Sequence, residues 1–484
     1  MKNKSKIINI AVAFVWILAL ALSVAGISGC GIINFGPDSG DAEDMTFASK
    51  NNYDRNDILA DAVESPAKPG EKDNINDNRT QTEKIPQVND TQPENTEETE
   101  ENENQTDSGA DIVETAEPEA TKSPEAEESI EKDGTVRLKF IAAGDNIIHL
   151  NMIDDAKERA KSGENFNFKD MYKDIASTVK AADIALVNVE TPIAGDEFSY
   201  DGYPMFNTPK ENGFALTDMG FNIINIANNH MLDKWEKGYI NNINFWEDQN
   251  VLLIGGFKNQ EDFENIRIYD KNGVSIAFLS YTYGTNGMVL PADSQMVIPF
   301  IDDATVERQV KAARPLADLL FVVMHWGDED SLTPNQWQRS LAQMMVDNGV
   351  DVIIGMHPHV FQETKWVSRP DGKKTLIAYS LGNMISGMLG AKNMIGGLLN
   401  FDIVKITKNG ESDTTIENVQ MIPIITHYNM RRKAFQVYRF DEYTEELAKA
   451  HGNINSDNKF SYKYIKDVII QNIAPEFLSD FYKD

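Results

Sequence analysis

From about residue 135 onward, apolar runs of strand length alternate with amphipathic segments of helical period. These runs predict strands at 136–145, 184–190, 221–227, 251–254, 274–281, 319–324, 350–354 and 375–379, and the segments between them predict helices at 168–181, 211–219, 235–249, 304–317 and 334–348. Near-continuously apolar strands separated by helices imply sheets that are covered on both faces. The pattern therefore predicts an α/β fold in which layered sheets are flanked by helices.

The predicted strands end in residues that can bind metal ions. At or just after these ends lie Asp145, Glu190, Asn229, His230, His325, His357 and His359. In layered α/β folds the ligand lies beyond the carboxyl ends of the strands, so we expect these side chains to meet at one rim. Imidazole, carboxylate and amide ligands without thiolate suit Mn, Fe, Zn or Mg. Because the set exceeds what one tetrahedral ion needs, it predicts a cluster of two divalent ions, which could activate water for attack on phosphorus.

The pair His357 and His359 follows an apolar run that ends in Gly355. Taken alone, the pair could be two surface-loop histidines held by backbone hydrogen bonds. The ligand-type residues at the other strand ends favour the metal site instead. The neighbours Asn229 and His230 suit the same chemistry, because the amide oxygen can bind an ion while the imidazole donates a proton to the leaving group.

Six motifs, in this order, resemble the bacterial CapA family of poly-γ-glutamate capsule synthesis proteins, which is similar in turn to the calcineurin-like metallophosphoesterases. They are Gly144-Asp145; Asn188-Val189-Glu190-Thr191-Pro192; Asn228-Asn229-His230 with Asp233; His325-Trp326-Gly327 with Glu329; His357-Pro358-His359-Val360; and Ser380-Leu381-Gly382-Asn383. The resemblance covers about residues 136–405. It implies that Asp145 and His359 bind a first metal, that Glu190 bridges, that Asn229, His325 and His357 hold a second metal, and that His230 is the acid.

The sequence departs from the phosphoesterase pattern at two places. Phosphoesterases have a histidine two residues after the first aspartate, whereas here Asn146 follows Asp145 and the next histidine is His149. Their bridging aspartate is replaced by Glu190. His149 is either a substitute ligand or a packing residue at the start of a helix.

Further residues of the motifs are expected to support the ligands. This set consists of Asn188, Asn228, Asp233, Trp326, Glu329, Ser380 and Asn383. Asp233 and Glu329 can accept the second ring N–H of metal-binding imidazoles. Trp326 is expected to wall the pocket and Asn383 to touch substrate. Ser380 lacks a surrounding Gly-x-Ser-x-Gly elbow, so a turn or a substrate contact is expected there.

The C-terminal part, from about Phe401, carries no recognisable chemistry. Strand-like runs lie at 402–406 and 419–425, and helices are predicted at 442–450 and 462–473. We expect His427 and His451 to be packing or surface histidines. The folded region is thus divided into a CapA-like domain at 135–410 and an extension at 411–484.

Residues 1–30 have the pattern of an export signal, with three lysines ahead of an apolar run and Ile27-Ser28-Gly29-Cys30 behind it. The last four residues resemble the lipobox of bacterial lipoproteins, in which the cysteine is lipidated. Cys30 is the only cysteine of the chain, which leaves none for disulfides. The alternative is an uncut anchor, because the run approaches the roughly 20 residues that span a bilayer. Both alternatives predict an extracytoplasmic protein anchored to the bacterial cell membrane.

Residues 31–134 are predicted to be a disordered acidic linker. They hold 29 Asp and Glu against 8 Lys and Arg, with few apolar clusters that could form a core. They account for most of the net charge of −31, which excludes bulk attraction to nucleic acid.

Three functions remain open. The first is a CapA-like role in making or exporting an anionic polymer such as poly-γ-glutamate, beside polymer synthase subunits. The second is an extracytoplasmic metal-dependent phosphoesterase. The third is a non-catalytic subunit of a membrane synthase. The predicted ligands favour a metal-dependent hydrolase, although they leave open whether the chain is an enzyme.

Overall fold

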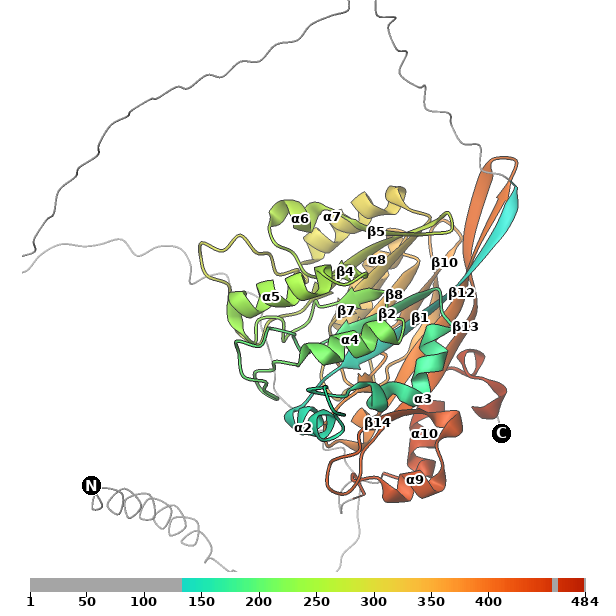
Figure 1. The fold of residues 1–484 in the computed structure, drawn as a ribbon. Coiled ribbons are helices and arrows are strands. Elements are labelled where there is room, and N and C mark those ends of the chain that lie inside the picture. The colour runs from blue at the N-terminus through green and yellow to red at the C-terminus, as the bar shows by residue number, and fades with distance from the viewer. Residues whose placement is uncertain (1–132, 455–459, 483–484) are drawn as a thin grey trace, which may run out of the picture. The chain divides into compact units, whose positions relative to one another are not determined.

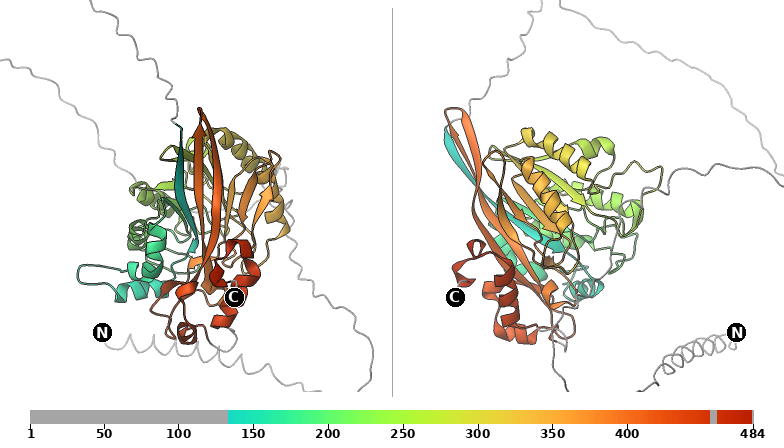
Figure 2. Two further views of the ribbon diagram at one scale, coloured as in Figure 1. Left: turned by 90° about the vertical axis from the view of Figure 1, so that its right-hand side faces the viewer. Right: turned by 180° about the vertical axis from the view of Figure 1, so that it is seen from behind.

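The computed structural model describes residues 133–454 and 460–482, which form two β-sheets with helices on their outer sides (Figure 1, Figure 2). The first sheet has the order β14 (Gln436–Arg439), β13 (Glu411–His427), β12 (Ile395–Lys408), β1 (Gly134–Asn146), β2 (Ile184–Val189), β3 (Ile223–Asn225), β4 (Leu252–Ile254), and β11 (Asn383–Ile385) pairs with β1. The second has the order β5 (Arg267–Lys271), β6 (Val274–Thr282), β7 (Leu319–His325), β8 (Val352–Met356), β10 (Lys374–Ala378), β9 (Thr364–Ser368). The predicted export signal, Cys30 and the acidic linker up to residue 132 lie outside the described residues, whereas Gly134, placed at the end of the linker, begins β1.

Helices connect the strands of both sheets. They are α2 (Leu150–Glu158), α3 (Lys169–Lys180), α4 (Lys210–Asp218) and α5 (Trp235–Glu247) between strands of the first sheet, α6 (Gln260–Glu264), α7 (Asp303–Ala313) and α8 (Gln336–Asp347) around the second, and α9 (Glu445–Ala450) and α10 (Tyr462–Asn472) near the C-terminus. Strands β1 to β4 run parallel to one another, and so do β6, β7, β8 and β10. The carboxyl ends of the strands in each parallel set therefore share one edge.

The two sheets pack face to face. The ring of Phe140 on β1 meets Phe321 on β7 edge to face, with centroids 5.2 Å apart, and stacks on Phe401 of β12 at 4.6 Å. Phe321 thus faces the first sheet, whereas its neighbours Leu320 and Val322 pack in a second core with α7 and α8. A strand that is buried on both faces must be apolar at every position, which explains the continuous apolar run of β7. The layers are helix, sheet, sheet and helix, and the predicted α/β fold class is confirmed.

Most predicted elements are present within a few residues of the expected bounds, but β12 and β13 begin seven and eight residues earlier than expected, and two helices have different ends. Pro334 was expected to begin α8, whereas the helix begins at Gln336 because Asn335 and Gln338 form a reciprocal capping box. The helix expected at 304–317 ends at Ala313, where Pro315 follows and the chain continues as a short 3₁₀ turn. Helix α2 and strands β5, β9 and β14 have signals too short to be predicted.

Strands β12 and β13 form a long hairpin that is paired along nearly its full length. The expected domain boundary at residue 410 lies in the turn of this hairpin, and both strands belong to the sheet of β1. We call the edge at which the strands end, and where the predicted ligands lie, the strand-end rim. The sheet that carries Asp145 and Glu190 of this rim therefore continues into the C-terminal part of the chain.

Strand β1 joins two distant parts of the described structure. Its first residue, Gly134, pairs with Thr407 near the turn of the hairpin, whereas Asp145 at its other end pairs with Asn188 and Asn383. The described chain therefore enters at the end of β1 that lies away from the strand-end rim. Across residues 133–454 and 460–482, no helix is both long and apolar enough to cross a membrane.

Candidate metal centre

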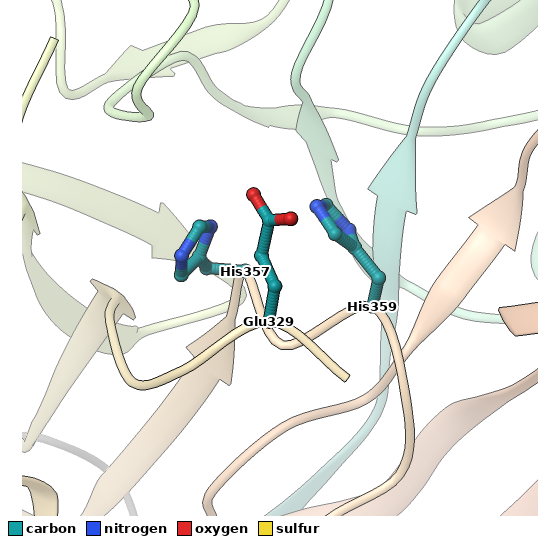
Figure 3. Close-up of side chains that lie close together, drawn as sticks. All are labelled: Glu329, His357 and His359. Atoms are coloured by element: carbon teal, nitrogen blue, oxygen red, sulfur yellow. The ribbon is translucent and has the colours of Figure 1, made fainter. Parts of the chain in front are cut away.

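Carboxylates from the first sheet and imidazoles from the second meet where the strands end. Asp145 lies near the end of β1 and Glu190 follows β2, whereas His325 ends β7 and His357 follows β8. The ligand atoms form two groups of three, each within 4.8 Å of one another: Asp145, Glu190 and His325 in one, and Glu329, His357 and His359 in the other. Figure 3 shows the carboxylate of Glu329 between the rings of His357 and His359. The structure thus brings the predicted ligands together, but the groups differ from the resemblance-based assignment, which put His359 with Asp145 and His325 with His357.

Both carboxylate oxygens of Asp145 are held in place. Asn188 donates to Oδ1 at 2.7 Å, and the backbone N–H of His357 donates to Oδ2 at 3.1 Å. The Nδ1 atom of His359 lies 3.2 Å from the same Oδ2. Asn188 is fixed in turn by the amide of Asn225, which donates to its Oδ1 at 2.8 Å. Supporting contacts of this kind keep a ligand oriented before a cation binds.

Glu190 lies among imidazoles without a hydrogen bond to any of them. Its Oε1 is 3.7 Å from His359 Nε2 and 3.9 Å from His325 Nε2. Within the described residues, neither of its buried oxygens has a partner, and nor does Nδ1 of His325 or of His357. Leaving a buried polar atom without a partner costs about 1–3 kcal/mol, and such atoms are rare. This donor set therefore fits divalent cations, which would satisfy atoms that the protein leaves without partners.

Asn229, the remaining predicted ligand at a strand end, lies beside His325. Its Oδ1 lies 2.8 Å from His325 Nε2, and its amide donates to Asn286 Oδ1 at 3.1 Å. The amide oxygen and the imidazole that were expected to hold one ion are thus neighbours.

The turn that carries His357 and His359 has an unusual backbone. Both residues have positive φ, at 94° and 57°, a region that residues other than glycine rarely adopt. The turn is held by the hydrogen bond from His357 N–H to Asp145 and by the contact of His359 Nδ1 with Asn383 Oδ1 at 3.1 Å. Such strain is retained where it positions functional groups.

Burial and charge set the protonation of the cluster. Burial raises the pKa of Glu190 well above its usual range, although the positive charge of His359 opposes the shift. Burial lowers the pKa of His325 and of His357 well below the usual range, and neighbouring imidazoles add to both shifts. Burial by itself would lower the pKa of His359, but the carboxylates of Glu190 and Asp145 outweigh it and raise the pKa to about 10. His325 and His357 are therefore neutral at pH 7 and able to bind a cation, whereas Glu190 and His359 would each release a proton when a cation binds.

His230, the expected acid, is oriented by a carboxylate. Asp233 Oδ2 lies 2.8 Å from His230 Nδ1 and accepts the backbone N–H of Phe206 at 2.7 Å. The Phe206 ring meets the imidazole edge-on, with centroids 4.8 Å apart. The backbone N–H of His230 donates to Asn228 Oδ1 at 3.0 Å. Because Nδ1 faces Asp233, Nε2 is the nitrogen left to exchange a proton.

The strand-end rim lies within a segment that matches a known family. Residues 139–388, more than half of the 484 in the chain, match the family described as "Bacterial capsule synthesis protein PGA_cap". The chain belongs to this family. Both groups of ligand atoms fall inside the matched segment of this PGA_cap protein.

Two curated relatives of this PGA_cap protein carry capsule names. The PGA biosynthesis protein CapA of Bacillus subtilis (strain 168) is 33% identical over 229 residues, which are 44% of this chain and 56% of that protein. The capsule biosynthesis protein CapA of Bacillus anthracis is 31% identical over 223 residues, which are 44% of this chain and 53% of that protein. The chain spans about half the length of these curated relatives.

Solved structures give a weaker likeness. The calcineurin-like phosphoesterase YfkN from Bacillus subtilis shares 14% identity at a TM-score of 0.35, over 70% of this chain and 97% of that one. The NAD nucleotidase of Haemophilus influenzae shares 12% identity at a TM-score of 0.36, over 72% of this chain and 57% of that one. These values support no inference about chemistry, so the PGA_cap site is interpreted from its own residues.

Several supporting residues of the PGA_cap motifs contact the ligands as expected, and some do so in a different way. Asn188 holds Asp145, and Asp233 holds His230. Asn383 was expected to touch substrate, but its side chain instead orients His359. Glu329 was expected only to orient imidazoles, yet its exposed carboxylate is itself one of the clustered ligand atoms.

Two residues of the motifs belong to the core rather than to the site. Trp326 was expected to wall the pocket, but it is fully buried, stacks on Tyr379 and donates its indole N–H to Tyr379 O at 3.0 Å. Ser380 is also fully buried, and its hydroxyl accepts the backbone N–H of Gly382 at 3.2 Å. These contacts favour the turn for Ser380 over a substrate contact.

The departures from the phosphoesterase pattern have local explanations in this PGA_cap protein. Ile147 stands two residues after Asp145 and is buried. The Asn146 side chain turns into the core, where it donates to the Tyr172 hydroxyl at 2.9 Å. His149 belongs to neither ligand group, and its Nδ1 accepts the backbone N–H of Gly387 at 3.1 Å. This contact favours the packing role for His149.

Sequence reasoning did not identify Tyr283 as part of the site. Its ring lies 4.4 Å from the His357 ring and is nearly parallel to the His325 ring at 6.3 Å. Burial raises the pKa of Tyr283 to about 12, so its hydroxyl stays protonated at neutral pH. Tyr283 directly follows β6. Its position after a strand could have identified it, but the sequence analysis applied that criterion only to residues that bind metals.

Proposed function

We propose that this protein acts in the synthesis or export of an anionic capsule polymer such as poly-γ-glutamate, and that its strand-end rim is a hydrolytic centre that holds two divalent metal ions. The observation that carries the proposal is the set of buried atoms without partners on Glu190, His325 and His357. Membership of the capsule synthesis family supports a role in making a capsule polymer, and the name of the Bacillus subtilis relative supports the same role.

The residues have separable roles in this centre. The group of Asp145, Glu190 and His325 would hold one ion, and the group of Glu329, His357 and His359 the other. When bound, divalent cations supply Lewis-acid polarisation of a phosphoryl or carbonyl oxygen. His230 holds the proton for the leaving group on Nε2, while Asp233 keeps the ring in place and stabilises its positive charge.

We also propose that the protein works at the outer face of the bacterial membrane. The support is the lipobox-like run ending in Cys30, which follows a basic and then an apolar stretch. Because a hydrolytic centre breaks bonds and does not join monomers, the polymerising subunits would be its partners.

Metal content and surface polymer test this proposal together. Asp145→Asn and His325→Asn in the full chain should each lower the metal bound per molecule, measured by mass spectrometry, and should abolish the polymer in complemented cells. Asp270→Asn is the matched control, because Asp270 is an exposed carboxylate on β5. It should change neither quantity.

Two results would favour the other functions. Purified protein without transition metal after growth in metal-replete medium would point to a non-catalytic subunit. Hydrolysis of an aryl phosphodiester that is lost in His230→Ala, with metal retained and polymer unaffected, would point to a general phosphoesterase.

A further inference from the structure

The C-terminal part of the chain brings a basic loop close to the candidate centre. Residues 429–434, between β13 and β14, include the consecutive cations Arg431, Arg432 and Lys433. This basic loop lies outside the segment 139–388 that matches the family. The family match therefore assigns no role to the three cations of this loop.

Of the three cations, Arg432 turns inward. Arg431 is exposed, and Lys433 pairs with Glu158 at 2.8 Å. The guanidinium of Arg432 donates through Nη2 to the backbone oxygen of Gly387, while its Nε is buried and has no partner among the described residues. Nor does any described carboxylate pair with Arg432. A buried donor of a charged group without a partner is costly, and an anion would satisfy it.

Gly387 links Arg432 to the candidate acid. Its backbone N–H donates to His149 Nδ1, and the His149 ring lies 5.4 Å from the Phe206 ring, which contacts His230. Burial lowers the pKa of His149 to about 4, and the positive charge of Arg432 adds to this shift. Arg432 and His149 thus contact the same residue, Gly387, at its backbone oxygen and its backbone N–H respectively.

A second path leads from Gly387 to the metal ligands. The next residue, Met388, has its sulfur 3.6 Å from the amide of Asn383, and Asn383 contacts the ring of His359. The basic loop is thus connected to His230 through His149 and Phe206, and to His359 through Met388 and Asn383, with two side chains on each path.

We propose that Arg432 forms an anion-binding subsite at the edge of the candidate centre, which holds a carboxylate or phosphate group of the substrate while another group of the substrate reacts at His230. The inference rests on the proposed function for the identity of the substrate. A γ-linked glutamate chain has a free carboxylate on every residue, so a chain that crosses the rim presents one to the subsite. The planar guanidinium can bind such a group through two parallel N–H bonds, which the ammonium of lysine cannot do.

The alternative is that Arg432 only ties the basic loop to Gly387. Arg432→Lys separates the two roles, because lysine can still donate to the Gly387 oxygen but has no fork of donors. Arg432→Met removes both contacts. Arg431→Gln is the matched control, since it removes an adjacent charge that is exposed to solvent.

Calorimetric titration of the full chain in detergent tests the subsite, with a γ-linked glutamate oligomer and glycerol phosphate as separate probes. Both Arg432→Lys and Arg432→Met should weaken binding about tenfold or more, as expected for loss of a charge-assisted pair, while Arg431→Gln should change it less than about twofold. Binding of the oligomer alone identifies a carboxylate subsite, and binding of glycerol phosphate alone identifies a phosphate subsite. Melting temperatures of all variants establish that they are folded.

Three outcomes would overturn the inference: Arg432→Lys binds like the wild type, Arg431→Gln weakens binding as much as Arg432→Met, or the wild type binds neither probe. The titration needs no turnover, so it separates this inference from the proposed function. If the protein holds no metal, or if the metal-site variants leave the polymer unchanged, the proposed function is wrong. Binding of a probe that depends on Arg432 would still support the anion-binding subsite.

Discussion

Gly144 lies where β1 passes the turn at 380–383. A Cβ added at Gly144 would lie 1.8 Å from the backbone oxygen of Gly382, which also accepts the N–H of Asp145 at 3.0 Å. No side chain can be accommodated there, because the neighbouring atom is backbone. The close approach of these two segments is what places Asp145 beside the ligands of the second sheet.

We therefore expect Gly144→Ala to destabilise the fold by about 1–3 kcal/mol or more, as overpacking does, and to lower metal content. Chemical denaturation and metal analysis measure the two effects. Gly284→Ala is the control, because nothing lies within 4 Å of an added Cβ there, and it should change stability by less than about 0.5 kcal/mol. Equal stability of the two variants would show that the approach at Gly144 is not a constraint.

Asp233 permits a second test, in which proton transfer is separated from metal binding. Its carboxylate contacts His230 Nδ1 and the Phe206 N–H but belongs to neither ligand group. Asp233→Asn keeps the size of the side chain and removes the charge that stabilises the imidazolium. Hydrolysis of an aryl phosphodiester should fall at least about tenfold, with metal content unchanged. Asp248→Asn, an exposed carboxylate at the end of α5, should have no effect, and loss of metal in Asp233→Asn would contradict the assigned role.

Among the elements, the end of β13 carries a buried histidine cluster apart from the rim. His427 Nδ1 lies 2.8 Å from the Tyr443 hydroxyl, and its ring meets His451 at 5.0 Å. Burial lowers the pKa of His427 to about 4 and that of His451 to about 3. Below the unfolded value of about 6.5, the unfolded chain binds protons that the folded chain excludes. Stability from this cluster is therefore present above pH 6.5 and is lost as the pH falls toward 4.

His427→Phe should reduce this loss. Between pH 7 and pH 5, the free energy of unfolding of the variant should fall less than that of the wild type, by on the order of 1–2 kcal/mol. Urea unfolding of metal-free protein at the two pH values measures the difference. If the variant and the wild type show the same dependence on pH, the cluster does not exclude protons in the folded state.

The elements that could be predicted from the sequence are those with a strong period. The run ending in His325 is apolar throughout because β7 is buried on both faces, and its length distinguishes it from a helix. Strand β9 is short and half exposed, so it lacks such a signal. The expected ligands lie close together because parallel strands bring their carboxyl ends to one edge of the sheet. This arrangement follows from the strand topology and does not depend on side-chain contacts.

Contacts between distant segments could not be predicted in this way. Trp326 follows a ligand directly, but its ring turns into the second core, since the direction of a side chain after a strand depends on the turn that follows. Arg432 is more than two hundred residues from His149, yet both contact Gly387, in a fold where β13 lies in the sheet of β1. A pattern along the chain contains no information on such contacts.

For the whole described structure, the two ends of β1 separate the start of the described chain from the candidate centre. The chain enters at Gly134, which pairs near the turn of the β12–β13 hairpin, and reaches the rim at Asp145, eleven residues later. A strand rises about 3.3 Å per residue, so the two points are roughly 35 Å apart along β1. Asp145 is the first residue assigned to the centre, and all others follow it in sequence.

Removal of residues 1–132 should therefore leave the centre intact. The melting temperature of the fragment should match that of the full chain in detergent within about 2 °C, a difference in stability below roughly 1.5 kcal/mol, and its metal content should be the same. Cells that make only this fragment, exported by a cleavable signal, should lack surface polymer because the fragment diffuses away from its membrane partners. Joining the fragment to an unrelated lipid anchor should restore the polymer, since the proposed role of the first 30 residues is attachment. If the fragment loses its metal, the N-terminal segment supports the centre, and if the foreign anchor fails to restore polymer, residues 31–132 act in more than attachment.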